Sequence, residues 1–159
     1  RTQVDASFYE SLTLTNEPLV MVMNRRHLCG ASPEEVRLAE LRAAPIILPL
    51  RWKRVFLTHC QRAGFTPGVI CESDSIVQNV LAVRAGLGCA LLPLSVRSLL
   101  PDDGQIVIKK LVEPEILTHT VMSWLKNHTL SAAASHFVDL FREMFAPEES
   151  RGKEEKISE

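Results

Sequence analysis

The chain has 159 residues, 46% of them apolar and 23% charged, and its net charge is −1 at pH 7. It is long enough to bury one hydrophobic core. Its 18 basic residues are scattered and matched by 19 acidic ones, which argues against a surface that binds duplex DNA. No apolar run approaches the roughly 20 residues of a membrane span and no signal peptide opens the chain, so a cytoplasmic protein is expected.

Strand and helix signals alternate along the first half of the chain. Residues 19–23 are a continuous apolar run, typical of a strand covered on both faces. The segment Ser32-Pro33-Glu34-Glu35 combines a hydroxyl cap, a first-turn proline and an acidic third residue, and therefore predicts a helix start.

A second strand and helix follow. Residues 46–48 predict a strand that Pro49 ends, and Gly64 marks the end of the next helix. The helix between them is indicated by apolar residues at helical spacing: Trp52, Val55, Phe56, Cys60 and Ala63.

Residues 72–93 are the most informative segment. Ser75 and Gln78 have the spacing of a capping box, in which each side chain bonds the other residue's amide, so a helix is expected to begin at Ser75. Gly86 is placed to end it, and residues 89–92 predict a buried strand. Its apolar stripe is expected from Ile76, Val77, Val80, Leu81 and Val83.

Further strands are expected at residues 69–71, 106–111 and 119–125. Thr129 or Ser131 is expected to cap a last helix, whose stripe comprises Leu130, Ala133, Phe137, Phe141 and Met144. After Pro147 the chain is polar and is expected to be disordered. Alternating strands and helices predict an α/β fold with a mainly parallel sheet flanked by helices.

The order of features in residues 72–93, with A-G-L-G between helix and strand and L-P at the end, resembles the effector-binding domain of LysR-type transcriptional regulators. Residues 17–23 and Arg26-His27-Leu28 resemble that family's first strand and its H-P-L turn, with Cys29 in place of the usual small residue. Residues 38–50 resemble its short helix before a central strand, and Ala63-Gly64-Phe65-Thr66-Pro67 resembles its A-G-F-x-P helix exit. The resemblance runs from about residue 14 to residue 145.

The resemblance implies a periplasmic-binding-protein-like (type II) subdomain of a bacterial regulator. Residues 1–18 would be a remnant of the first subdomain and hinge, 19–116 the second effector-binding subdomain, 117–146 a crossing-back strand and helix, and 147–159 the tail. DNA would be bound only through an N-terminal helix-turn-helix domain that precedes this fragment. The strand and helix after residue 117 would lack most of their partner sheet, so a homo-oligomer joined through them is expected.

A small ligand is expected beyond the carboxyl ends of the strands, where helix N-termini present unpaired amides. Two strand-to-helix turns qualify: Pro49, Leu50 and Arg51, and Ser73, Asp74 and Ser75. The helix dipoles and the Arg51 charge favour a small anion, although Asp74 could instead hold an ammonium or hydroxyl group. The resemblance implies the same turns, because the family's effector cleft lies between subdomains and is lined by them.

Plainer interpretations stand beside these. Arg51 could be a solvated loop cation, and Ser75 is a structural cap whether or not it touches ligand. The four cysteines are typical of reduced core thiols. His27 with Cys29 and His59 with Cys60 lack a recognisable zinc spacing, so neither a metal nor a cofactor is expected.

Three classes of function remain. A ligand-sensing domain of a transcription regulator is favoured, in which a small metabolite, expected to be anionic, modulates transcription. A solute-binding protein of a transport system would share the architecture. An enzyme is not expected, because no base is paired with a nucleophile in the sequence.

Overall fold

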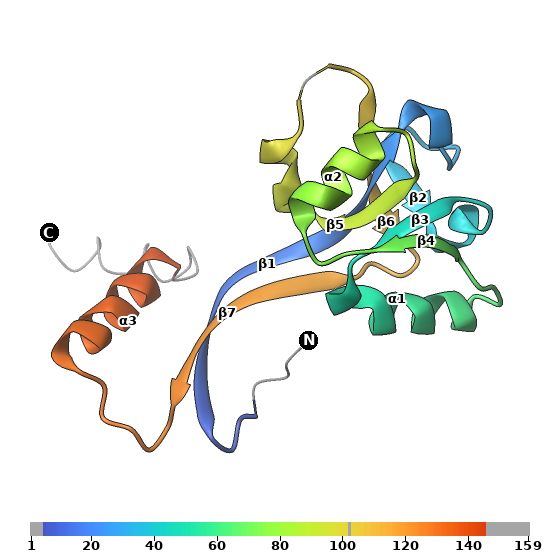
Figure 1. Cartoon of the computed structure of the whole chain (residues 1–159). Coiled ribbons are helices and arrows are strands. Elements are labelled where there is room, and N and C mark those ends of the chain that lie inside the picture. Colours follow the sequence, from blue (N-terminus) through green and yellow to red (C-terminus); the bar gives the residue numbers. More distant parts are fainter. Residues whose placement is uncertain (1–4, 102, 146–159) are drawn as a thin grey trace, which may run out of the picture. The chain divides into compact units, whose positions relative to one another are not determined.

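A computed structural model describes residues 5–101 and 103–145 (Figure 1). The strands are β1 (Tyr9–Asn24), β2 (Glu35–Arg37), β3 (Pro45–Leu48), β4 (Gly68–Glu72), β5 (Cys89–Pro93), β6 (Ile106–Val112) and β7 (Leu117–Leu125). The α-helices are α1 (Leu50–Arg62), α2 (Ile76–Arg84) and α3 (Ala132–Met144), and short 3₁₀ helices are η1 (Arg25–His27), η2 (Leu38–Leu41) and η3 (Leu94–Leu99).

The chain divides into two compact units. One is Glu17–Thr118, and the other contains the described residues of Thr2–Asn16 and His119–Glu159. Each has its own packing, so the two are taken in turn. The predicted tail at 147–159 lies outside the described residues.

The larger unit is built on a mixed sheet. Its described strands lie in the order β2-β6-β1-β5-β3-β4, and β7 also pairs with β1. The pairs β2–β6, β3–β4 and β3–β5 are parallel, whereas β1 runs antiparallel to both β5 and β6. The predicted α/β class is confirmed, with β1 as an antiparallel strand that the alternation of helices and strands did not reveal.

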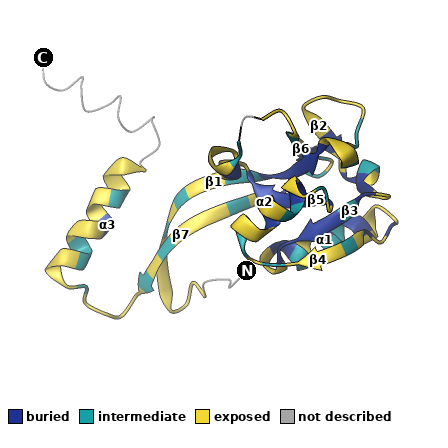
Figure 2. Cartoon of the chain, turned by 45° about the horizontal axis from the view of Figure 1, so that its top comes forward, coloured by how far each residue is buried: buried dark blue, intermediate teal, exposed yellow. Residues whose placement is uncertain are grey.

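The centre of this sheet is formed by β1 and β5. The two apolar runs expected as buried strands, 19–23 and 89–92, pair in register, with Met21 opposite Leu91. All of these side chains are buried (Figure 2). Figure 1 shows α2 above the sheet and α1 below it, which explains why strands covered on both faces carry no polar alternation.

Helix α1 forms where the sequence predicts, but two members of its expected apolar stripe, Val55 and Ala63, are exposed. Its buried residues Trp52, Phe56 and Cys60 recur every four positions, so they share the face that packs on the core. The helix ends at Arg62, two residues before Gly64, whose φ of +74° suits glycine, and the Phe65 amide then donates to the Cys60 carbonyl at 3.0 Å.

Helix α2 begins and ends where expected, but its apolar stripe is only partly buried. Val80 and Val83 are in the core, whereas Val77 is 61% exposed and Leu81 is also exposed. The buried face includes Asn79 instead. The prediction that all five apolar residues face the core was therefore wrong, because only positions near Val80 and Val83 point to the sheet.

The predicted helix start at residues 32–35 is wrong. The Ser32 hydroxyl does accept from the Glu34 and Glu35 amides, at 3.3 and 3.2 Å, as a cap would. The chain then enters strand β2, where Val36 is buried opposite Leu111 of β6. Pairing with a sheet edge thus outweighs a local capping signal that lacks an apolar helical stripe after it.

The smaller unit contains the first part of β1, most of β7 and α3. Ser11 and Ser123 share a hydrogen bond at 3.0 Å, and the Lys126 amide donates to the Phe8 carbonyl at 2.9 Å. Of the two predicted caps, Ser131 is the one used, and it accepts from the Ala134 amide at 3.2 Å. Strand β7 therefore has a partner within this chain, which the sequence interpretation missed.

Candidate ligand-binding site

The two predicted turns lie side by side at one edge of the sheet. Strands β3 and β4 are parallel, with Leu48 opposite Glu72, so the segments that follow them leave from the same end. The first turn leads through Pro49 into α1, and the second leads through residues 73–75 into α2. The structure thus brings the predicted site residues together.

Arg51 and Asp74 join the two turns directly. The Asp74 carboxylate oxygen Oδ1 accepts from the Arg51 backbone amide at 3.0 Å and from its Nε at 3.3 Å. The Arg51 Nη2 donates to the Asp74 carbonyl at 3.2 Å. Sequence reasoning proposed both residues, but not that they bind each other.

This pairing changes the electrostatics expected for the site. Asp74 places its carboxylate on a first-turn amide of α1, so it already occupies the anion position that the helix dipole favours. The two side chains are 50% and 45% exposed, and an ion pair so open to water adds little to stability. Two of the five guanidinium N–H groups are used in these contacts, which leaves donors for a ligand.

A second ion pair, between Lys53 and Glu72, crosses the same two segments. The Lys53 Nζ lies 2.7 Å from a Glu72 carboxylate oxygen. Neither residue was among the predicted site residues. The signal that would have found them is the parallel register, since residues after adjacent parallel strands meet at one edge of the sheet.

The Ser73 to Ser75 turn is held by a short relay of hydrogen bonds. Ser75 Oγ accepts from the Gln78 amide at 3.3 Å, which confirms the helix cap. The Gln78 side chain does not return to Ser75. Its Oε1 accepts from Ser73 Oγ at 2.8 Å, and the Ser75 amide donates to that same hydroxyl at 3.2 Å. The predicted reciprocal capping box is therefore wrong in one half, because Ser73 intervenes.

Asn79 is a site neighbour that the sequence interpretation missed. It is 1% exposed, and its Nδ2 donates to the Ser73 carbonyl at 2.9 Å. Its Oδ1 has no hydrogen-bond partner among the described residues. The sequence does contain a signal for this residue, because Asn79 is a polar side chain within the apolar part of α2, and a buried polar group requires a hydrogen-bond partner.

Pro49 and Leu50 bring apolar side chains to the first turn. Pro49 is buried and precedes α1, and its carbonyl accepts from the Trp52 amide at 3.1 Å. The Leu50 side chain is exposed beside Arg51. Trp52, expected in the apolar stripe of this helix, is buried, which confirms its place in that stripe.

The pKa of Asp74 lies below its ordinary value, chiefly because the carboxylate accepts from the Arg51 amide. The Arg51 side chain lowers this pKa further by its hydrogen bond and its charge. Because its pKa is lower in the folded state, the ionised Asp74 carboxylate stabilises the fold at pH values above its unfolded pKa. That stabilisation is lost as the pH falls through the folded pKa. Both partners are exposed, so the effect on stability is small.

In Arg51→Ala we expect the pKa of Asp74 to rise and yet to stay below the ordinary aspartate value. The backbone amide, which is the largest cause, survives this substitution. NMR titration of the Asp74 side-chain carboxyl measures it. A pKa unchanged from that of the unsubstituted chain would show that the side-chain contact does not form in solution.

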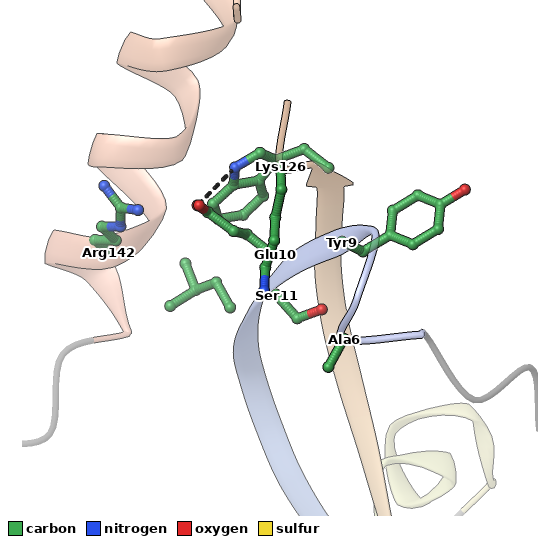
Figure 3. A pocket seen from close by; sticks show the side chains of 8 residues that line it. Ala6, Tyr9, Glu10, Ser11, Lys126 and Arg142 are labelled. Carbon is green, nitrogen blue, oxygen red and sulfur yellow. Dashed lines mark hydrogen bonds between the residues drawn. The ribbon is translucent and has the colours of Figure 1, made fainter. Parts of the chain in front are cut away.

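The smaller unit has a pocket of its own, of about 450 Å³. Figure 3 shows Tyr9 and Glu10 of β1, Lys126 after β7 and Arg142 of α3 around it. The Trp124 indole N–H donates to Glu10 at 3.1 Å. The sequence interpretation did not propose this pocket, because its residues come from the two ends of the chain.

Across 5–101 and 103–145, no three His, Cys, Asp or Glu side chains are grouped as metal ligands would be. The helices described here include none with the length and hydropathy to cross a membrane.

Known proteins resemble this chain over most of its length. Residues 1–146 match the family model described as the LysR substrate binding domain. The chain belongs to this family. It is similar to the HTH-type transcriptional regulator YwbI of Bacillus subtilis, with 31% identity over 138 residues, which are 82% of the chain and 44% of YwbI. The chain thus spans less than half the length of this curated relative.

Solved structures of bacterial regulators show the same fold. HinK, a LysR family transcriptional regulator from Pseudomonas aeruginosa, has 27% identity and a TM-score of 0.73 over 91% of this chain and 51% of its own. The regulatory domain of CcmR from Synechocystis PCC6803, solved in complex with 2-PG, has 17% identity and a TM-score of 0.74, over 92% of this chain and 70% of its own. The predicted periplasmic-binding-protein-like fold and LysR resemblance are confirmed.

Proposed function

We propose that this chain is the effector-sensing part of a cytoplasmic LysR-type transcription regulator. The observation that carries this proposal is the family match over residues 1–146, together with relatives that are themselves named transcriptional regulators. Residues 19–116 would form the second effector subdomain. DNA would be bound through an N-terminal helix-turn-helix domain, and the regulator would act as a homo-oligomer.

The proposed effector is a small anion held by the two turns after β3 and β4. Arg51 is the cationic anchor, because its ion pair with Asp74 is exposed and leaves guanidinium N–H groups to donate. The start of α2 supports the anion through its dipole, and Ser73 and Ser75 line this turn. Asp74 favours a ligand that also carries a hydroxyl or ammonium group.

The buried amide of Asn79 supports the same position. Within the described residues its Oδ1 has no hydrogen-bond partner, while its Nδ2 donates to the Ser73 carbonyl, so this side chain is coupled to the turn. A ligand or a water that donates to Oδ1 would satisfy it. CcmR, whose fold is shared, was solved with 2-PG, which makes 2-PG a reasonable first probe.

The alternatives receive less support. A solute-binding protein of a transport system would share the architecture, but the relatives compared above are regulators by name. Enzymatic function has no support from the candidate site. Its ion pairs join exposed side chains, and no nucleophile is hydrogen-bonded to a base there.

We expect Arg51→Ala to weaken binding of an anionic effector about tenfold or more, because a hydrogen bond to a charged group contributes roughly 1.5–3 kcal/mol. Calorimetric titration of the full-length regulator, first with 2-PG and then with a panel of small carboxylates and phosphates, provides the affinity. Arg54→Ala is the matched control, because Arg54 lies exposed on the same helix.

The control should bind like the unsubstituted regulator. Equal affinities in Arg51→Ala and the unsubstituted protein would remove Arg51 from the site, and equal losses in both variants would indicate a general effect of charge. Binding that follows Arg51 alone supports the proposed anchor.

A further inference from the structure

Three sulfur atoms gather where β1 ends, away from the turns after β3 and β4. Met23 of β1 and Cys89 of β5 are directly opposite each other across the antiparallel pair. Cys29 follows η1, and its Sγ lies 3.8 Å from the Met23 Sδ. The Cys89 thiol donates to the His27 carbonyl at 3.3 Å, two residues before Cys29. Both thiols therefore share one small region.

A buried lysine lies against this cluster. Lys109 of β6 is 2% exposed, and its Nζ donates to the carbonyls of Cys29 and Gly30 at 2.8 and 2.9 Å, and also to that of Ser32. No carboxylate contacts this ammonium within the described residues. Burying a cation without a counter-ion is costly, and a thiolate beside it would supply the missing negative charge.

The two thiols differ strongly in acidity. The Cys89 thiol, which can turn from His27 to donate to an ionised Cys29, is the main cause that lowers the pKa of Cys29 to about 7. The Lys109 charge lowers this pKa further, while burial and Glu40 oppose the shift. The pKa of Cys89 is raised by the same hydrogen bond and by burial.

The remaining cysteines lack this environment. Cys60 is buried, and burial raises its pKa to about 11. Cys71 is exposed on β4 and lies outside the cluster. The expectation of core thiols therefore holds for Cys60 and Cys89, whereas Cys29 is half-buried and within reach of a small oxidant.

We propose that Cys29 and Cys89 form a peroxide-reactive dithiol that closes to a disulfide. Cys29 is the attacking sulfur, because it is the more accessible of the two and lies beside the Lys109 ammonium. Cys89 is the resolving sulfur. This modification site lies outside the proposed ligand-binding residues and does not depend on them.

The reaction uses one molecule of hydroperoxide. The Cys29 thiolate attacks one peroxide oxygen, the O–O bond breaks, and the second oxygen leaves as water after taking a proton, which gives a sulfenic acid on Cys29. The Cys89 sulfur then attacks the Cys29 sulfur, and the hydroxyl leaves as a second water with the Cys89 proton. Two thiols lose two electrons and the peroxide gains them.

The test treats the 159-residue chain with one equivalent of hydrogen peroxide at pH 7, blocks remaining thiols and maps the peptides by mass spectrometry. The expected product is a Cys29–Cys89 linked peptide pair, with a mass loss of about 2 Da that dithiothreitol reverses. The pKa of Cys29 is lowered to about 7, so about half of this thiol is thiolate at pH 7. A more acidic thiolate is also a weaker nucleophile, so we expect Cys29 to be oxidised roughly fivefold faster than an ordinary exposed thiol.

Variants separate the steps. Cys71→Ser should form the same disulfide at the same rate, whereas Cys89→Ser should stop at a sulfenic acid on Cys29 that dimedone traps. Oxidation of Cys71 ahead of Cys29 in the unsubstituted chain would overturn the proposal, as would oxidation of Cys29 without any link to Cys89. The mapping on the unsubstituted chain decides this even if a variant folds poorly.

Discussion

Replacing Phe56 by alanine is expected to lower the free energy of unfolding of the larger unit by about 4 kcal/mol. Phe56 is the largest fully buried apolar side chain on α1, and it packs in the same core as β3 and β5. Removing its ring loses the transfer free energy of the buried atoms. It also leaves a cavity that close-packed neighbours do not refill.

Val55→Ala is the control for this prediction. Val55 precedes Phe56 on the same helix and is 39% exposed, so its truncation should change the free energy of unfolding by less than about 1 kcal/mol. Denaturant unfolding followed by circular dichroism and by Trp fluorescence measures both. Similar losses in the two variants would contradict the burial of Phe56 against the sheet.

The second large effect is expected at Gly88, between α2 and β5. A Cβ at this position would lie 2.5 Å from the Pro45 backbone oxygen and 3.1 Å from the Ile70 side chain. The first contact is with backbone at the start of β3, which cannot rotate away. Gly88→Ala should therefore separate β5 from β3 locally, and we expect a loss of about 3 kcal/mol.

Gly68→Ala makes the same chemical change where there is room. A Cβ at Gly68 would have its nearest contact at 3.7 Å, to the Ala44 carbonyl oxygen, which is ordinary van der Waals contact. We expect the Gly68→Ala substitution to change the free energy of unfolding by less than about 1 kcal/mol. If Gly88→Ala were as stable as Gly68→Ala, the close approach of Gly88 to β3 would be wrong.

Helices and strands could be predicted from the sequence where the spacing of apolar residues and the end signals match the residues that the structure buries. Helix α1 has buried residues every four positions and a glycine at its end, so periodicity and capping specify it without tertiary information. Strand β5 is an uninterrupted apolar run, and only a position covered on both faces suits it. Family resemblance placed these elements in order.

Elements set by pairing could not be predicted in the same way. Residues 32–35 carry a helix-start signal, yet Val36 gains burial beside β6 only as a strand. The antiparallel direction of β1 depends on β5 and β6, which come much later in the chain.

The candidate site shows the same division. The sequence placed Arg51 and Asp74 after two strands, and the site residues remain a prediction. Their ion pair depends on β3 and β4 being adjacent and parallel, which no local pattern states. Asn79 was missed for a similar reason, because its burial follows from the orientation of α2 on the sheet.

The central claim is that a small anionic effector binds the turns after β3 and β4. The most direct measurement is the change in amide NMR shifts of the full-length regulator on titration with the tightest ligand from the calorimetric panel. We predict that the largest changes fall on the amides of Arg51, Ser73 and Ser75, and that they saturate with the calorimetric affinity. Saturating changes confined to other residues, such as those around the Glu10 and Arg142 pocket, would contradict the claim.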